Sequence, residues 1–276
     1  MYLWRKHVTN DWLREHSTAL ITRHGADMAI VEQPGKARTL VEVCCGGRIE
    51  AKQLQRELGG TIEKLRADWL QQFARKSRAK PLRVGSRLVV SRGAQSKLKR
   101  PRNIVIPAEA AFGTGDHATT AMCLRMLERI TRRLDVWTML DAGTGSGILA
   151  IAGSCFGAKR IVAIDNDPIA TSTAERNARM NRQRHIEFRT GDVLKQKLPG
   201  KFDVITANLF SEILIAALPV WLPHLANNGR LILSGVLRSQ EPAVLIALRR
   251  NGLRAEEIRR RGKWIALLAV KARERS

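Results

Sequence analysis

Three glycines at alternate positions follow an apolar segment, in the sequence DAGTGSG at residues 141–147. Glycine lets the backbone turn sharply and approach a ligand closely. A dinucleotide-binding fingerprint would need another glycine at position 148, where this chain has Ile148. We predict a strand-to-helix turn in which Gly143 and Gly145 approach a bound cofactor; the alternative is the same turn without a ligand.

An acid ends the next apolar segment, which reads IVAIDNDP over residues 161–168. Asp165 can accept hydrogen bonds from both hydroxyls of a ribose, as carboxylates at the end of a second parallel strand do. Enzymes that use NAD share this feature, so Asp165 predicts an adenosine-containing cofactor without fixing the reaction. Asp167 precedes Pro168 and predicts a helix N-cap.

Polar residues also follow two later strand-like segments. Asp192 in TGDV could accept a hydrogen bond from an adenine amino group, or be a plain loop aspartate. Asn208 in DVITANLF lies at the carboxyl end of a central strand, where ligands bind in open α/β sheets. Its side-chain carbonyl could orient a substrate amine, which makes Asn208 the predicted catalytic residue; the alternative is an asparagine that closes a turn. Phe210 could line the mouth of the site or pack in the core.

A glycine-rich segment, AFGTGDHATT at residues 111–120, leads into a hydroxyl-rich helix start. Together with DAGTGSGILAIA, IDNDP and ANLF, it closely resembles the ribosomal protein methyltransferase PrmA family. LILSGVL at residues 231–237, Trp264, and the segments at 68–69 and 81–88 also fit. The resemblance is strong from about residue 67 to the end and weak over the first 66 residues.

The resemblance implies an S-adenosylmethionine-dependent protein-lysine N-methyltransferase that acts on large-subunit ribosomal protein eleven. It implies cofactor contacts at Thr120, Gly143, Asp165 and Asn208, and methyl transfer to lysine ε-amines or an N-terminal amine. Asp116 stands where the family varies and Ala118 where it often has proline, so an extra acid near the active mouth could alter substrate choice. His117 could relay a proton through water or hold the start of a helix.

Residues 109–276 alternate strand and helix, which predicts a parallel, doubly wound α/β sheet of the Rossmann-like class I methyltransferase kind. Two closing strands, 253–259 and 264–270, with only a turn between them, predict a terminal antiparallel hairpin. Pro219 predicts a break or kink in the helical segment 212–225. Residues 1–66 follow the order β-α-β-β-α-β and predict a small ferredoxin-like α+β domain, to which the resemblance assigns substrate recognition.

Residues 67–108 predict a basic linker, because no acid occurs between positions 71 and 108. The whole chain has 48 lysines and arginines against 25 aspartates and glutamates, a formal net charge of +23. Such charge indicates a polyanionic neighbourhood, with incidental contact to rRNA through the linker, or merely a basic proteome.

Two alternatives to protein methylation stay open: an rRNA methyltransferase, and a ribosome-binding module that holds the cofactor without turnover. The chain lacks the Asn-Pro-Pro-aromatic motif of many nucleic-acid amino-methyltransferases. A short-chain dehydrogenase is excluded, because it needs a catalytic tyrosine and the one tyrosine is Tyr2.

The four cysteines lack metal-ligand spacing, so we expect reduced thiols and no metal. They are Cys44, Cys45, Cys123 and Cys155. No targeting segment or apolar run of about 18 residues is evident, and we expect a cytoplasmic protein without a membrane span. The oligomeric state is not predicted.

Overall fold

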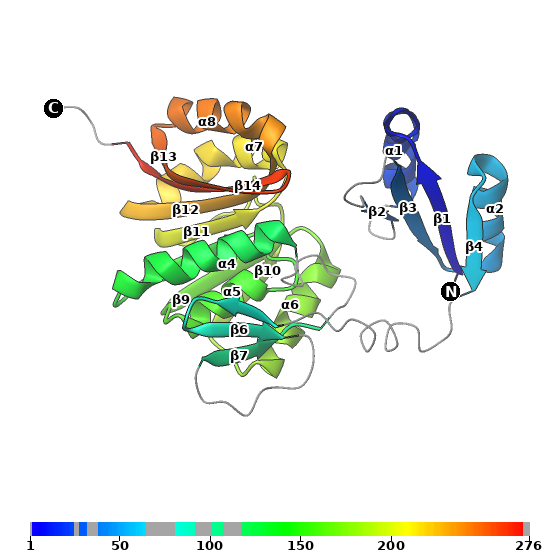
Figure 1. Cartoon of the computed structure of the whole chain (residues 1–276). Helices are drawn as coiled ribbons and strands as arrows, with labels where there is room; N and C mark the ends of the chain where they lie inside the picture. Colours follow the sequence, from blue (N-terminus) through cyan, green and yellow to red (C-terminus); the bar gives the residue numbers. More distant parts are fainter. Residues whose placement is uncertain are drawn as a thin grey trace. The chain divides into compact units, whose positions relative to one another are not determined.

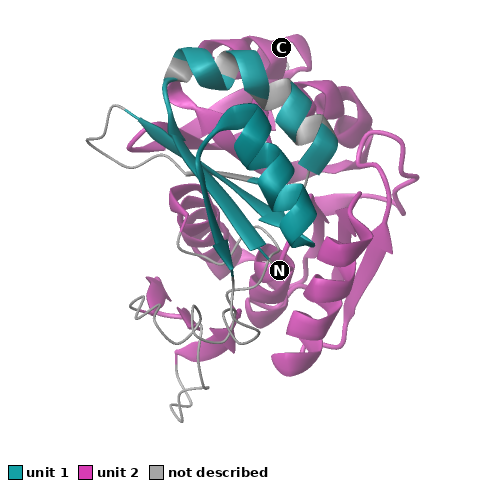
Figure 2. Ribbon diagram, turned by 90° about the vertical axis from the view of Figure 1, so that its right-hand side faces the viewer, with its two compact units in different colours: residues 1–77 teal, residues 78–276 magenta. Residues whose placement is uncertain are grey.

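The computed structural model describes residues 2–24, 28–31, 38–64, 81–91, 101–107 and 117–272. The chain divides into two compact units, residues 1–77 and residues 78–276 (Figure 1, Figure 2). Among the described residues, we find no helix that is both long and apolar enough to span a membrane.

The N-terminal unit is a four-stranded sheet with two helices. Its elements are β1 (Tyr2–Val8), α1 (Asn10–His24), β2 (Met28–Val31), β3 (Thr39–Cys45), α2 (Arg48–Leu58) and β4 (Thr61–Lys64). The strands lie in the order β2-β3-β1-β4 and every neighbouring pair is antiparallel, which is the split βαβ arrangement. Alternate residues of β3, among them Val41 and Val43, are buried with Ala51 and Leu54 of α2.

The C-terminal unit is built on a seven-stranded sheet. Its strands are β8 (Thr138–Ala142), β9 (Arg160–Asp165), β10 (Ile186–Thr190), β11 (Phe202–Asn208), β12 (Leu225–Leu237), β13 (Leu253–Arg261) and β14 (Trp264–Lys271). They lie in the order β10-β9-β8-β11-β12-β14-β13. The first five are parallel, while β14 is antiparallel to both β12 and β13. The predicted doubly wound sheet and its terminal antiparallel hairpin are confirmed.

Helices cover both faces of this sheet (Figure 1). They are α4 (Ala118–Ile130), α5 (Ile148–Cys155), α6 (Pro168–Met180), α7 (Ser211–Trp221) and α8 (Glu241–Arg250). Successive strand residues point to opposite faces, so Met139 packs in the core with α4 and α5, whereas Leu140 packs in the core with α7 and α8. Burial on both faces explains why the strands are almost continuously apolar.

Part of the predicted linker at residues 67–108 is folded. β5 (Leu82–Val84), β6 (Leu88–Ser91) and β7 (Arg102–Val105) form a three-stranded sheet, and apolar side chains of all three strands belong to the core that contains α4. Residues 67–80 and 92–100 lie outside the described residues. The C-terminal unit therefore includes three strands that precede residue 109.

The sequence predicts a break or a kink at Pro219, and the structure shows no break there, because α7 continues through this residue. α7 runs to Trp221, and a short 3₁₀ turn at Leu222–His224 leads directly into β12. Proline removes one helical hydrogen bond. Leu218 and Trp221 are buried on either side of Pro219, and this packing holds the last turn of the helix in place.

Asn181 fastens β7 to the end of α6. Its Oδ1 accepts the Val105 N–H and its Nδ2 donates to the Val105 carbonyl, both at 2.7 Å. Asn181→Ala leaves both buried backbone groups unpaired, so we expect the free energy of unfolding to fall by about 2–4 kcal/mol in urea denaturation. The exposed Asn227→Ala on β12 is the control and should change it by no more than about 0.5 kcal/mol. Equal effects of the two substitutions would show that Asn181 does not fasten this contact.

Candidate active site at the carboxyl edge of the sheet

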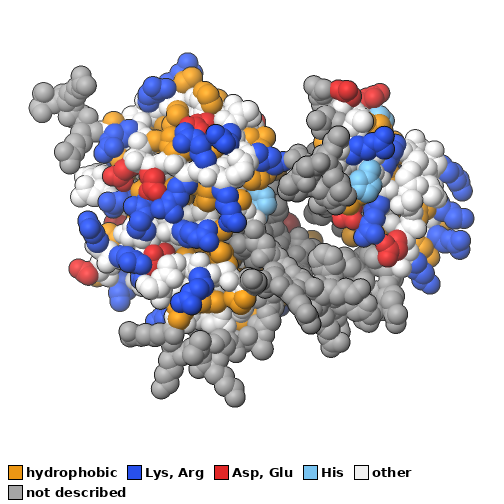
Figure 3. All heavy atoms as spheres, in the orientation of Figure 1, with side chains coloured by type: hydrophobic (Ala, Val, Ile, Leu, Met, Phe, Trp, Pro, Cys, Tyr) orange, Lys and Arg blue, Asp and Glu red, His pale blue; other side chains and the backbone are white. Residues whose placement is uncertain are grey.

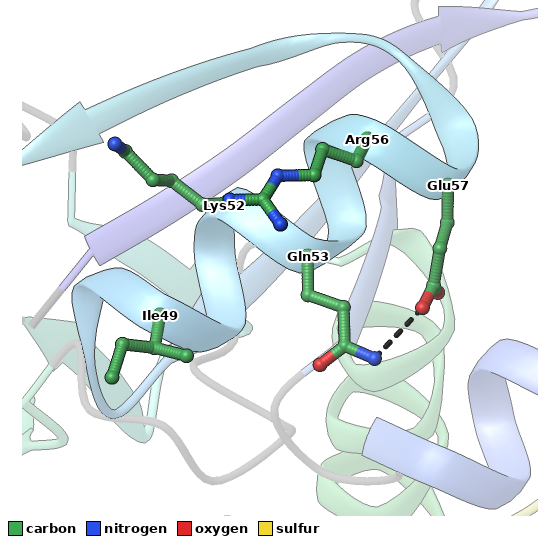
Figure 4. A pocket seen from close by; sticks show the side chains of 5 residues that line it. All are labelled: Ile49, Lys52, Gln53, Arg56 and Glu57. Carbon is green, nitrogen blue, oxygen red and sulfur yellow. Dashed lines mark hydrogen bonds between the residues drawn. The ribbon is translucent and has the colours of Figure 1, made fainter.

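A shallow surface pocket lies on α2, lined by Ile49, Lys52, Gln53, Arg56 and Glu57 (Figure 4). Gln53 Nε2 donates to Glu57 Oε1 at 2.8 Å, and the isoleucine is largely exposed. The polar groups of this pocket belong to the solvent-exposed side of one helix. None of the predicted site residues lies there, because all of them belong to the C-terminal unit.

The predicted site residues follow three strands whose carboxyl ends are aligned. Ala142 of β8 pairs with Ile164 of β9 on one side and with Ala207 of β11 on the other. The chain changes direction across the sheet between β8 and β11, which is where ligands bind in open α/β sheets. The parallel register thus brings the ends of these strands to one edge.

The loop between β8 and α5 depends on glycine. Its three glycines, Gly143, Gly145 and Gly147, have φ angles of 73°, 54° and 80°. The N–H groups of Gly143 and Thr144 donate to the Ile164 carbonyl at 2.8 and 3.0 Å, which fixes the turn against β9. A Cβ atom on Gly143 would lie 2.3 Å from Leu209 Cδ2. A side chain at Gly143 would therefore displace the residue that follows Asn208.

Asp165 ends β9 beside this loop. Its Oδ2 accepts the Gly145 N–H at 2.8 Å and its Oδ1 accepts the Asp167 N–H at 3.1 Å. Each carboxylate oxygen has two lone pairs, so both can accept a further hydrogen bond. This half-buried carboxylate fits the two hydroxyls of a ribose. Asp167 itself accepts the Ile169 N–H at 2.8 Å, which confirms the predicted N-cap.

Asn208 lies at the end of β11, and only the nitrogen of its side-chain amide is hydrogen-bonded among the described residues. Nδ2 donates to Thr120 Oγ1, a buried hydroxyl in the first turn of α4, at 3.3 Å. Oδ1 is buried and has no hydrogen-bond partner among the described residues. Leaving such an acceptor unsatisfied costs about 1–3 kcal/mol. The arrangement suits a donor that arrives with a ligand.

The sequence reasoning missed the role of Asp141. This carboxylate is fully buried and accepts hydrogen bonds from Thr144 Oγ1 at 2.7 Å and Thr206 Oγ1 at 2.6 Å. It therefore links the glycine loop to β11, two residues before Asn208. The signal in the sequence was the acid two residues before the first glycine, together with threonine at positions 144 and 206.

His117 and Asp192 have structural partners. His117 is the N-cap residue of α4; its Nδ1 lies 2.7 Å from Thr119 Oγ1, and its ring meets Trp264 edge-on at 4.9 Å. Burial, with a smaller effect of Lys263, lowers the pKa of His117. Asp192 Oδ1 accepts the Leu194 N–H at 2.9 Å and so closes a turn.

Phe210 is 70% exposed, which removes the alternative that it packs in the core. It directly precedes α7 and lies two residues beyond Asn208. Asp116 and the rest of residues 111–116 lie outside the described residues, whereas Ala118 begins α4.

Three comparisons with known proteins agree. The family described as ribosomal protein L11 methyltransferase (PrmA) matches residues 28–272. Among curated proteins, the ribosomal protein L11 methyltransferase of Pelobacter propionicus is 38% identical over 211 residues, covering 74% of this chain and 67% of the relative. That of Heliobacterium modesticaldum is 36% identical over 208 residues, covering 74% and 64%. The matched part spans about two thirds of the length of these relatives.

One solved structure is similar in both fold and sequence. It is the ribosomal protein L11 methylase of Lactobacillus delbrueckii subsp. bulgaricus, with a TM-score of 0.64 and 32% identity. The match covers 70% of this chain and 99% of that one.

Burial raises the pKa of Asp141 from 3.8 to about 6, against the opposing effect of its two threonine hydroxyls. The folded protein then binds this proton more tightly than the unfolded chain. The stability that this carboxyl contributes is therefore largest below about pH 4 and falls as the pH rises to about 6, by roughly 3 kcal/mol. We expect Asp141→Asn to remove this dependence, so that the difference in unfolding free energy between wild type and variant shrinks or reverses between pH 4 and pH 7. A constant difference over that range would contradict the assignment.

Proposed function

The chain belongs to the ribosomal protein L11 methyltransferase (PrmA) family, and we propose from this that it transfers methyl groups from S-adenosylmethionine to amines of a large-subunit ribosomal protein. The single observation that carries the proposal is the buried Oδ1 of Asn208 at the switch point of the sheet, which has no hydrogen-bond partner in the part of the chain that the structure describes. A hydrogen-bond acceptor at that place suits an amine substrate.

The glycine loop and Asp165 would hold the cofactor. The remaining acceptor capacity of the two Asp165 oxygens fits the hydroxyls of a nucleoside, and Gly145 positions the Asp165 carboxylate through its N–H. Thr120 would act through Asn208, to which it is hydrogen-bonded. When bound, S-adenosylmethionine supplies an electrophilic methyl group on a positively charged sulfur.

Asn208 would position the amine for attack. Free lysine has a pKa near 10.4, and the attacking nitrogen must be neutral. Desolvation in the site and the nearby positive charge both favour the neutral form, so a dedicated base is not required. Asn208 Oδ1 accepts one N–H of the amine and thereby directs the nitrogen lone pair toward the methyl carbon. Orientation of this kind supplies much of the rate.

We further propose that the lysine side chain is the methyl acceptor and that residues 1–66 form the substrate-recognition domain. We propose the cytoplasm as the location of the protein, because ribosomal proteins are made there. The split βαβ arrangement of the N-terminal unit supports its treatment as a separate recognition module.

The proposal is tested by incubating the protein with labelled S-adenosylmethionine and separated ribosomal proteins and rRNA. We expect label in a large-subunit protein. Label in RNA alone would make the protein an rRNA methyltransferase and overturn the proposal. Binding of the cofactor without transfer to any ribosomal fraction would overturn it in favour of a module without turnover.

Asn208→Ala should lower the rate of methyl transfer by roughly 100-fold or more, because a positioned polar group near the reacting atoms is typically worth that much. The free energy of unfolding should change far less, since removal of Asn208 also removes a buried unsatisfied acceptor. The two quantities are measured by steady-state kinetics and urea denaturation. Unchanged turnover would contradict the orienting role.

Asp165→Ala should weaken S-adenosylmethionine binding by roughly tenfold to a hundredfold, because hydrogen bonds to a charged group contribute about 1.5–3 kcal/mol. Isothermal titration calorimetry measures the affinity. Glu187→Ala on β10, an exposed carboxylate 52% accessible at its side chain, is the matched control and should leave the affinity unchanged. If both variants bind the cofactor as the wild type does, Asp165 is not a cofactor ligand.

A further inference from the structure

Eight arginines gather on one side of the C-terminal unit, over α4 and the edge strand β13. Their members are Arg125, Arg129, Arg132 and Arg133 of α4 and the 3₁₀ turn after it, Arg230 of β12, and Arg254, Arg259 and Arg261 of β13. We call this surface the α4–β13 face. Figure 3, in the orientation of Figure 1, shows several lysine and arginine side chains on the face of the unit where α4 lies.

The register of the hairpin places the β13 arginines on the same side of the sheet as α4. Arg259 pairs with Ala266 and Arg261 pairs with Trp264, and both partners pack in or against the core that contains α4. Cross-strand partners lie on the same face of a sheet. Arg129 of α4 also forms an ion pair with Glu257 of β13, so the helix and the strand form one continuous surface.

The arginines of α4 follow the helical repeat. Arg125, Arg129 and Arg133 are four residues apart, and residues at that spacing lie on one side of a helix. Arg125 is half-buried and Arg129 is exposed, in a helix whose other residues from Thr119 to Ile130 are all buried; Arg133, in the 3₁₀ turn that follows the helix, is exposed as well. This row of positive charge is therefore the solvent side of α4.

Acidic groups neutralise only part of this charge. Glu257 forms ion pairs with two arginines, Arg129 and Arg259. Glu128 is nearly buried and is held by Nε and Nη2 of Arg132. With Glu256, which lies 4.0 Å from Arg230, three carboxylates contact four of the eight guanidinium groups among the described residues.

We propose that the α4–β13 face binds the phosphate backbone of RNA. A guanidinium group presents several N–H donors in a planar fork that matches phosphate oxygens, and a row of them suits a regularly charged polyanion. The bonds to Glu128 and Glu257 hold three of the arginines, Arg129, Arg132 and Arg259, in place before any ligand arrives. This binding goes beyond the proposed methyl transfer and needs no turnover, so either can fail without the other.

The experiment measures binding of a fluorescein-labelled hairpin RNA to the full chain by fluorescence anisotropy over a range of salt concentrations. The test variant is Arg133→Gln, Arg254→Gln, Arg261→Gln, three exposed residues that form no ion pair among the described residues. The matched control is Arg184→Gln, Arg249→Gln, Arg250→Gln, which removes the same charge from exposed positions. Arg184 precedes β10 at the opposite edge of the sheet, and α8 covers the opposite face.

We expect the test variant to bind RNA at least about tenfold more weakly and to lose about two to three from the slope of log affinity against log salt. The control variant should lose much less affinity and much less of the salt slope. Both variants should keep the melting temperature of the wild type. Equal losses in the two variants would show that binding follows net charge alone and would overturn the proposal. So would the absence of RNA binding, or an equally strong, equally variant-sensitive binding of a polyglutamate peptide.

Discussion

The side chain of Asn208 is the constraint on which the carboxyl edge of the sheet depends. Its Nδ2 ties β11 to the first turn of α4 through Thr120, while its Oδ1 stays buried without a partner among the described residues. That unsatisfied acceptor is tolerated because the surrounding structure holds it in place. Asp141 joins the glycine loop to β11 through two threonine hydroxyls, and the parallel register aligns β8 with β11. A rigid edge that holds the Asn208 acceptor in a fixed place is what positioning a substrate amine requires.

Much of this edge could be predicted from the sequence because its local requirements are strict. Gly143 is needed where a Cβ would meet Leu209, and α6 begins at Pro168, directly after the predicted N-cap Asp167. Asp141 escaped prediction because its role depends on burial and on Thr206, which is far away in the sequence. The strands β5, β6 and β7 were missed because arginines and lysines between the apolar residues made the segment resemble a solvated linker. At Pro219, tertiary packing overrode the local tendency to break the helix.

The net charge of +23 has a structural interpretation in which the proposed RNA-binding surface is distinct from the proposed methyl-transfer site. The basic linker suggested by the sequence is partly a folded sheet. Among the described residues, eight arginines lie together on the α4–β13 face. The methyl-accepting group and the polyanion would therefore meet different parts of the C-terminal unit. His117 and Trp264 pack together at the start of α4 and of β14, and Trp264 is the cross-strand partner of Arg261. A basic surface is thus compatible with a protein substrate and does not make RNA the methyl acceptor.

The most direct test of the central claim is the intact mass of a purified large-subunit ribosomal protein, the L11 protein after which the family is named, before and after incubation with this protein and S-adenosylmethionine. The account predicts a gain of one or more whole methyl groups that maps to amines. An unchanged mass under conditions in which the cofactor demonstrably binds would contradict it.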